Sequence, residues 1–371
     1  LSYYKAILKL KGEAFYLAVE LLKQYRSVSD FMEAIFLDKQ YSFIADGIAR
    51  INLERELKKL KESLNNEQVD QVIHFHNELY PKQFYAMPDP PLILYYKGNI
   101  SALNAQPAVS VIGSRKADEE GVIVAKEIGY FLAKNKICVV SGLAYGCDGA
   151  AHRGALLAVS KPAENFVPTV AVLANGLDTV YPSSHRTLSA EIVKKGGVLL
   201  SEYDFKETPR KPYFLRRNRL IAALASGVVI VQASERSGSL VTARAALEYN
   251  KEVMVVPGSV LSPLYQGSNE LLAQGAVPVR NGKDVVNHLG LECVKEKRKQ
   301  DLEENNLKLS PSAKIIFGYL KEKNGKAFID QLTERFKEEE VLISLQELEE
   351  AGLVVIRLNN LVQVVSCEAK I

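Results

Sequence analysis

Short, continuously apolar runs recur along the middle of the chain and limit its possible folds more than any other feature. Each run is rich in β-branched residues, and amphipathic stretches separate the runs. The runs are 109–112, 137–140, 169–173, 197–200, 228–231 and 252–256. Strands covered by helices on both faces have such runs, whereas a half-solvated strand alternates apolar and polar residues. The pattern predicts an α/β domain over residues 108–290, built on a doubly wound sheet.

Both ends of the chain differ from this middle part. Residues 1–65 have apolar side chains at helical spacing, which predicts a small helical domain. Residues 310–371 have three helical patterns and then two apolar runs around Asn359 and Asn360. Such a pair suits a tight hairpin because asparagine tolerates positive φ. Helices followed by a hairpin predict a winged-helix-like domain.

Two segments are predicted to connect these parts. Residues 66–107 include four prolines between Tyr80 and Pro91. Because proline has no backbone N–H donor, we expect an extended linker or edge segment there. Residues 291–309 are dense in charges of both signs and predict a charged linker. A chain of 371 residues is expected to contain two or three domains.

The overall charge of the chain is nearly balanced, so the protein as a whole is not strongly basic. Lys and Arg number 47 and Asp and Glu 44, so the net charge is only +3 and any anion site must be local. No run of 18 apolar residues occurs, and the chain does not start with a secretory pattern. We therefore expect a soluble, cytoplasmic protein without a membrane partner. The four cysteines lack C-x-x-C spacing and a partnered histidine pattern, so neither a disulfide framework nor a zinc site is indicated. No cofactor is expected.

Two loops after predicted strands have the residues of an anion site. In an open α/β sheet, ligands bind beyond the carboxyl ends of the strands. The first strand leads into Gly113, Ser114 and Arg115, which offer backbone N–H groups, a hydroxyl and a planar donor fork. The fifth strand leads into a second group, which consists of Ser237, Gly238, Ser239 and Thr242. Small hydroxyl residues with a glycine at a helix start form an anion nest.

The strongest local signal is a basic segment, residues 210–219, which follows the fourth strand. Five of its ten residues are basic and two are aromatic, a composition typical of a single-stranded nucleic-acid site. Its candidate DNA-binding residues are Lys211, Phe214, Arg216, Arg217, Asn218 and Arg219. An apolar helix follows, so these cations lie at a helix start, where the macrodipole disfavours them. This placement predicts a bound anion that compensates them.

Signals for catalysis are weak in comparison. The chain contains neither a Walker A sequence nor G-x-S-x-G. Asp148 and His152 could form an acid/base pair on one helix face, but we favour structural roles, with His152 bonding a nearby loop. His74 and His76 have no carboxylate or cysteine at ligand spacing, which disfavours a metal site. We therefore predict no enzyme activity and no hydrolysis of ATP or DNA.

Taken together, these loops resemble the DNA-processing protein A (DprA/Smf) family of bacterial natural transformation. The matching residues run in family order over about 108–279, and 80–81 and 88–91 extend the match upstream. They are Gly113 to Arg115, Ser141 to Ala144, Gly146, Asp148, Ala151, His152, Gly176 to Asp178, Tyr181, Pro182, Ser201 to Tyr203, Phe214 to Arg219, Arg236 to Ser239 and Thr242 to Arg244.

This resemblance implies a fold and a function. The middle domain would be an extended Rossmann-like fold that binds single-stranded DNA and forms a homodimer. Family members protect incoming strands and load the RecA recombinase onto them without hydrolysing a nucleotide. The N-terminal part resembles the sterile-alpha-motif-like (SAM-like) module of longer members, and the C-terminal part resembles their winged helix; both match by layout.

Two positions depart from the family pattern. Tyr145 stands where many members have Arg, and Cys147 where Ile is usual, so the resemblance does not imply a DNA contact by these side chains.

Two other classes of function remain as alternatives. The first is a nucleoside-monophosphate phosphoribohydrolase on a related Rossmann-like fold. That enzyme would carry P-G-G-x-G-T before its last major helix, whereas residues 237–242 read Ser-Gly-Ser-Leu-Val-Thr. The second is a protein scaffold, which would leave the basic segment unexplained.

The predicted winged helix is acidic where such domains enter DNA. Residues 327–351 have two basic side chains, Arg335 and Lys337, against eight acidic ones, a net charge of −6. In a major groove these carboxylates would face phosphates and oppose the counterion release that drives binding. We expect this surface to bind a basic protein partner or the sheet domain rather than duplex DNA.

Overall fold

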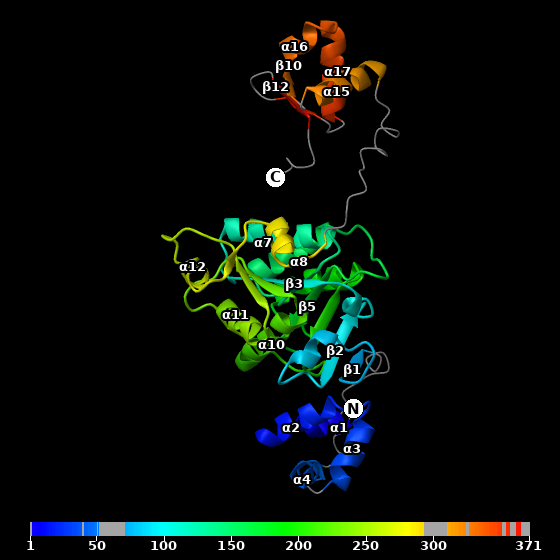
Figure 1. Ribbon diagram of the computed structural model, residues 1–371, viewed down its shortest axis with the longest axis vertical. Helices are drawn as coiled ribbons and strands as arrows, with labels where there is room; N and C mark the ends of the chain where they lie inside the picture. Colours follow the sequence, from blue (N-terminus) through cyan, green and yellow to red (C-terminus); the bar gives the residue numbers. More distant parts are fainter. Residues whose placement is uncertain are drawn as a thin grey trace. The chain divides into compact units, whose positions relative to one another are not determined.

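Figure 1 shows the computed structural model, which forms two compact units, Leu1–Val294 and Lys295–Ile371. The structure describes residues 2–38, 41–49, 51, 71–292, 310–323, 326–350, 354–356 and 361–364. Most of the predicted charged linker, from residue 293 to residue 309, lies outside the described residues. The predicted hairpin turn at Asn359 and Asn360 also lies outside them.

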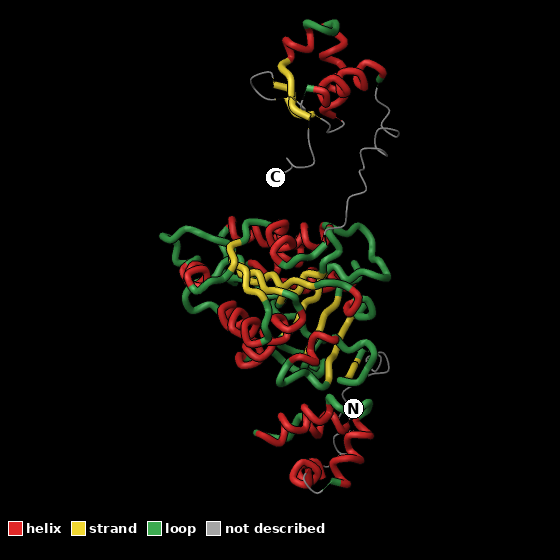
Figure 2. Tube along the Cα trace, viewed as in Figure 1, coloured by secondary structure: helices red, strands yellow, loops and turns green. Residues whose placement is uncertain are grey.

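A nine-stranded sheet forms the centre of the first unit (Figure 2). Its strands are β1 (Val72–His74), β2 (Ile93–Gly98), β3 (Ala108–Ile112), β4 (Cys138–Ser141), β5 (Thr169–Leu173), β6 (Val198–Ser201), β7 (Gly227–Ile230), β8 (Glu252–Val255) and β9 (Val277–Pro278). Their spatial order is β1-β2-β6-β5-β4-β3-β7-β8-β9. Neighbours from β6 to β9 are parallel, whereas β2 is antiparallel to β1 and β6. The six apolar runs form β3 to β8, which confirms the α/β prediction.

Helices cover both faces of this sheet, which explains why its central strands are apolar on both sides. One face carries α7 (Glu119–Lys134), α8 (Cys147–Leu157) and α13 (Gly282–His288), and the other α10 (Lys211–Leu224) and α11 (Gly238–Glu248) (Figure 1). Val109 and Val111 of β3 pack in the core with the first set, whereas Ala108 and Ile112 pack with the second. The remaining helices of this part are α9 (Arg186–Lys194) and α12 (Gln266–Ala273).

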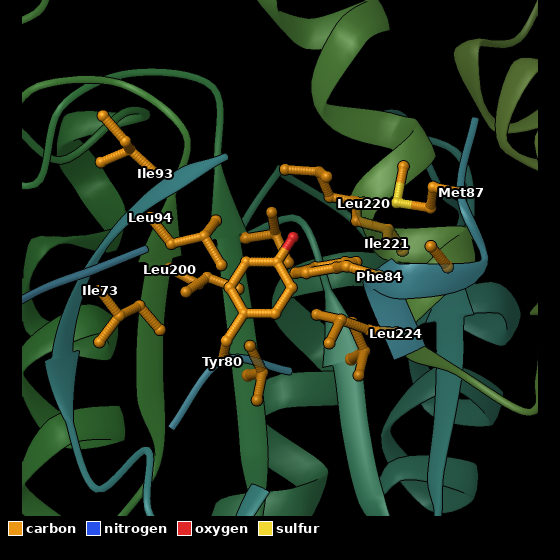
Figure 3. Close-up of a cluster of buried hydrophobic side chains, with 14 of the residues drawn as sticks. Ile73, Tyr80, Phe84, Met87, Ile93, Leu94, Leu200, Leu220, Ile221 and Leu224 are labelled. Carbon is orange, nitrogen blue, oxygen red and sulfur yellow. The ribbon is translucent and has the colours of Figure 1, made fainter. Parts of the chain in front are cut away.

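Residues 71–107, expected as an extended linker or edge segment, form one edge of the sheet through β1 and β2. Two short 3₁₀ helices lie in this segment, η2 (Lys82–Ala86) and η3 (Leu103–Ala105). Tyr80, Phe84 and Met87 are buried beside Leu220 and Leu224 of α10 (Figure 3). Burial of each such side chain contributes about 1.5–3 kcal/mol. The proline-rich segment is therefore fixed against α10.

The described N-terminal residues, 2–38, 41–49 and 51, contain helices, as their apolar spacing predicts, whereas residues 52–65 of the predicted domain lie outside the described residues. These helices are α1 (Ser2–Ile7), α2 (Glu13–Leu22), α3 (Val28–Leu37) and α4 (Ser42–Ala49). The Tyr4 hydroxyl lies 2.6 Å from His76 Nδ1, and Lys5 Nζ lies 3.0 Å from an oxygen of Asp204. These contacts join α1 to the sheet edge. The SAM-like assignment stays a prediction.

The second unit contains three helices and three strands among its described residues. They are α15 (Pro311–Glu322), β10 (Lys326–Phe328), α16 (Ile329–Thr333), α17 (Glu338–Glu350), β11 (Val354–Ile356) and β12 (Leu361–Val364). The strands form an antiparallel sheet in the order β10-β12-β11. The three predicted helical patterns and the hairpin strands are found, whereas β10 was not predicted. The winged-helix assignment stays a prediction. Among the described residues, no helix combines the length and apolarity needed to cross a membrane.

Candidate nucleic-acid interface

The loops that follow β3, β4 and β7 are fastened together at the carboxyl edge of the sheet. Ser114 N donates to Gln232 O at 2.7 Å, and Cys147 N donates to Ser114 O at 3.2 Å. Gly146 has a φ of +69°, and a Cβ built on it would lie 2.1 Å from Ser114 O. Only glycine therefore fits there. Gly113 and Ser114 are both buried, so they shape this edge rather than extend from it.

Arg115 and Phe214 come together at this edge, and Lys211 begins the helix that carries Phe214. The guanidinium carbon of Arg115 lies 4.9 Å from the centroid of the Phe214 ring, within cation–π range. Phe214 is half-buried in the first turn of α10, and Lys211 is the first residue of that helix. Both Arg115 and Lys211 are exposed. The structure thus places the accessible Arg115 against an aromatic ring, with the accessible Lys211 three residues before that ring on the same helix.

Arg217 points into the protein and does not join that group. Its side chain donates from Nη1 to Gly142 O at 2.6 Å and also to Val172 O, and the residue is only 4% exposed. Burial lowers the pKa of Arg217 to about 10, against the opposing effect of the Asp148 carboxylate. This geometry does not support the expectation that Arg217 contacts phosphate. It holds the ends of β4 and β5 instead.

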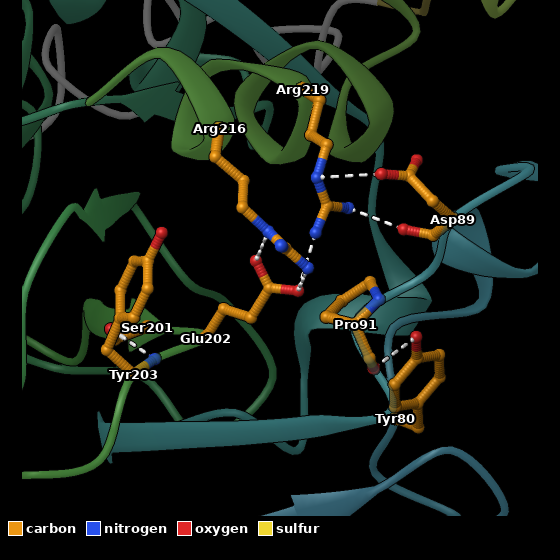
Figure 4. Close-up of polar contacts among 8 residues, drawn as sticks. All are labelled: Tyr80, Asp89, Pro91, Ser201, Glu202, Tyr203, Arg216 and Arg219. Atoms are coloured by element: carbon orange, nitrogen blue, oxygen red, sulfur yellow. Dashed lines mark hydrogen bonds and ion pairs between the residues drawn. The ribbon is translucent and has the colours of Figure 1, made fainter. Parts of the chain in front are cut away.

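Arg216 and Arg219 are paired with carboxylates of the protein (Figure 4). Arg219 Nη2 lies 2.5 Å from Glu202 Oε1, and its Nε lies 3.3 Å from Asp89 Oδ2. Arg216 donates from Nε and Nη2 to the two Glu202 oxygens at 3.2 and 3.3 Å, and this carboxylate raises the pKa of Arg216. The sequence pattern predicted that a ligand compensates these cations. The structure shows that Glu202 and Asp89 already do so.

The start of α11 lies next to α10 through Asn218. The Asn218 side chain donates from Nδ2 to Gly238 O at 3.2 Å. Ser237 caps α11 by accepting a bond from Ser239 N at 3.3 Å. Gly238 is exposed, whereas Ser239 and Thr242 are buried. Of the predicted anion nest, the backbone at Gly238 is accessible to a ligand, whereas the Thr242 side chain is buried.

His152 has the structural role that we favoured. Its Nε2 accepts from Leu143 N at 3.3 Å, and its Nδ1 lies 2.7 Å from Thr169 Oγ1, which itself donates to Val139 O. These partners suit a neutral ring with the proton on Nδ1. Burial lowers the pKa of His152 to about 3. The ring is therefore uncharged at neutral pH and bonded on both sides.

Asp148, in the first turn of α8, is tied to the loop after β4, since it accepts a bond from Gly142 N at 3.1 Å. Burial raises the pKa of Asp148, and the Arg217 guanidinium opposes this shift. Among the residues that the structure describes, no group of three or more side chains could hold a metal ion.

Sequence reasoning missed three residues of this region as site residues: Asp89, Tyr181 and Glu202. Glu202 directly follows β6, so the rule that functional groups follow parallel strands could have identified it. Asp89 is remote in sequence from its arginine partner, and no local pattern indicates the pair. The ring of Tyr181 lies 5.4 Å from that of Phe214, at an interplanar angle of 62°.

Comparison with known proteins gives consistent matches over the same region. The sequence model of a family described as DNA recombination-mediator protein A matches residues 71–290. The chain is 38% identical over 210 residues to the DNA processing protein DprA of Streptococcus pneumoniae, which spans 57% of this chain and 71% of that protein. The family match spans all nine strands of the main sheet and every loop described above.

Two solved structures are similar in fold. An X-ray structure of DprA from Streptococcus pneumoniae matches with a TM-score of 0.57 and 30% identity, over 75% of this chain and 98% of that one. A structure of DNA processing protein A from Helicobacter pylori matches with a TM-score of 0.52 and 33% identity, over 59% of this chain and 95% of that one. The latter is described as showing a single-stranded DNA binding mode.

Proposed function

Because the chain belongs to the DNA recombination-mediator protein A family, we propose that it binds single-stranded DNA in natural transformation, protects incoming strands and loads RecA onto them. The observation that carries this proposal is the group of Arg115, Lys211 and Phe214. It combines two exposed cations with an aromatic ring, which are the groups that contact phosphates and stack on unpaired bases. The binding mode described for the Helicobacter pylori relative supports the same ligand.

Each predicted site residue takes one of two roles in this proposal. Arg115 and Lys211 contact phosphates, Phe214 stacks on a base, and the exposed backbone at Gly238 donates to a phosphate oxygen. Arg216 is exposed enough to reach the strand while it remains paired with Glu202. The positioning residues hold these groups in place, and they are Gly113, Ser114, Arg217, Asn218, Arg219, Ser237, Ser239 and Thr242.

The proposal also covers partners and domains. It includes a cytoplasmic homodimer formed through the Rossmann-like domain and a direct contact with RecA, both resting on family membership. It also includes the SAM-like and winged-helix assignments. Analytical ultracentrifugation tests the dimer. An assay of RecA filament formation on strands coated with single-strand-binding protein tests the loading step, and RecA assembly that is no faster with the protein present would contradict it.

A competition experiment tests the central part of the proposal. A fluorescent oligothymidine bound to the protein is challenged with unlabelled single-stranded or duplex DNA of the same length. We expect the single strand to compete at far lower concentration, because base stacking requires unpaired bases. Equal competition by duplex would contradict single-strand specificity.

The enzyme alternative is tested in parallel with nucleoside monophosphates. A phosphoribohydrolase would release the free base from AMP. The combination of an aromatic ring with two accessible cations favours a polymer with repeating phosphates over a mononucleotide. We expect no base release. Turnover that copurifies with the protein and disappears in a variant of a carboxyl-edge loop would favour the enzyme.

A further inference from the structure

Tyr181 extends the aromatic surface beyond the residue that sequence reasoning identified. It lies in the loop after β5, whereas Phe214 lies in the first turn of α10, after β6. The two rings meet edge to face, with centroids 5.4 Å apart. Two elements distant in sequence thus form one continuous aromatic corner beside Arg115.

The two rings of this corner differ in how much room they leave for a base. The Arg115 guanidinium already lies over the Phe214 ring, which is half-buried. Tyr181 is 46% exposed. Among the described residues, no cation lies over the Tyr181 ring and no partner binds its hydroxyl. A base can therefore stack on Tyr181 without displacing an existing contact.

Packing does not account for the exposed ring of Tyr181. Tyr80 and Tyr95 show how this protein uses tyrosine in its core, since each is at most 2% exposed and donates its hydroxyl, to Pro91 O and to Asp204 respectively. Tyr181 has neither property. Contiguous exposed aromatic surface of this kind commonly marks a binding site.

The loop that carries Tyr181 is held in place before any ligand arrives. Asn175 Nδ2 donates to Thr179 O at 2.5 Å and to Gly176 O at 2.8 Å. Lys97 Nζ donates to Leu177 O at 3.0 Å. A preformed platform loses little conformational entropy when a base stacks on it.

We propose that Tyr181 is a second base-stacking platform, adjacent to Phe214, in the single-strand site. The inference rests on the proposed function, because a stacking platform has meaning only if the protein binds unpaired bases. Arg115 and Lys211 then contact the phosphates that flank the two stacked bases. The bound DNA strand then runs from the loop after β5 to the start of α10.

Photo-crosslinking tests this proposal on the unaltered full-length protein. An oligothymidine containing a single 5-iododeoxyuridine is irradiated in complex with the protein. Loss of HI then joins C5 of uracil to a ring stacked on it, and mass spectrometry of the digest identifies the residue. We expect adducts on Tyr181 as well as Phe214. Adducts on Phe214 alone would overturn the second platform while leaving single-strand binding intact.

Substitution gives an independent readout. Tyr181→Ala should weaken oligothymidine binding about tenfold, whereas Tyr181→Phe should bind almost as the wild type. The salt dependence of both variants should match that of the wild type, because a lost ring releases no counterion. The matched control is Tyr130→Ala, since Tyr130 is 41% exposed but lies near the opposite end of α7.

Two results separate this inference from the function on which it rests. Unchanged affinity in Tyr181→Ala, with a thermal midpoint equal to that of the wild type, would overturn the inference alone. A wild-type protein that binds no oligothymidine and gives no adduct would overturn both.

Discussion

Three arginines within four positions of α10 differ in what their guanidinium groups contact. Arg216 is exposed and shares Glu202, Arg219 is buried between Glu202 and Asp89, and Arg217 donates to backbone carbonyls inside the protein. Because a buried guanidinium without partners is costly, each has found acceptors. Arginine is therefore exposed at position 216 and part of the buried structure at positions 217 and 219.

Replacement of Arg217 should affect folding first. Arg217→Met removes the donor to Gly142 O and Val172 O and leaves Asp148 without its opposing charge. A buried acceptor left without its donor costs about 1–3 kcal/mol, so the free energy of unfolding in urea should fall by at least that order. Arg236→Ala, an exposed site, is the control and should change it by less than about 0.5 kcal/mol. An Arg217→Met variant as stable as the wild type would contradict the structural role of Arg217.

His152 should make stability depend on pH. Its pKa is about 3 in the folded protein and 6.5 for an unperturbed ring, so between these values the unfolded chain binds a proton that the folded one excludes. Stability from this group is complete above pH 6.5 and falls as the pH drops, by at most about 1.4 kcal/mol per pH unit.

Urea denaturation of wild type and His152→Gln between pH 7 and pH 4 measures this effect. The pH dependence should be weaker in His152→Gln than in the wild type. Identical pH dependence of the two proteins would refute the buried neutral ring.

Local sequence patterns indicate that Lys211, Phe214 and Arg115 lie near the carboxyl edge of the sheet, but for a physical reason they do not indicate where the neighbouring arginine side chains point. The first three lie at a helix start or a strand end, positions that local patterns reveal. The inward direction of Arg217 depends on the carbonyls of Gly142, just after β4, and Val172, in β5. The position of the Arg219 side chain depends on Asp89, far away along the chain. The composition of one segment cannot reveal contacts with residues that are distant in the sequence.

At the scale of elements, Glu202 connects the end of β6 to α10. Its carboxylate side chain is 8% exposed and accepts from both Arg216 and Arg219. Glu202→Gln should lower the free energy of unfolding by about 3–5 kcal/mol, because it leaves the buried Arg219 underpaired. Glu191→Gln removes an exposed pair with Lys195 and should cost less than about 1 kcal/mol. Similar losses in both variants would contradict this distinction.

Sequence periodicity predicted the elements of the sheet better than its edges. Strands β3 to β8 are covered on both faces, so their continuous apolar runs identify them. β1 has three residues, and the short β10 immediately precedes α16, too little sequence for a period to be recognised. The proline-rich segment was expected to be extended, but its burial against α10 depends on long-range packing.

For the whole molecule, the acidic second unit should contribute little to single-strand affinity. Residues 327–351 carry a net charge of −6, and the first unit is compact by itself. Deletion of residues 310–371 should therefore leave the dissociation constant for oligothymidine nearly unchanged, or lower it. A large loss of affinity, with the remaining protein still folded by circular dichroism, would show that the second unit takes part in DNA binding.

The most direct test of the account is the salt dependence of single-strand binding by phosphate-contact variants. Fluorescence anisotropy with oligothymidine over a KCl series gives the slope of log K against log salt for wild type, Arg115→Ala and Lys211→Ala. Each substitution should reduce the magnitude of that slope by about 0.7, the value for one phosphate contact on a single strand. Slopes equal to that of the wild type in both variants would contradict the assignment of the carboxyl edge as the DNA site.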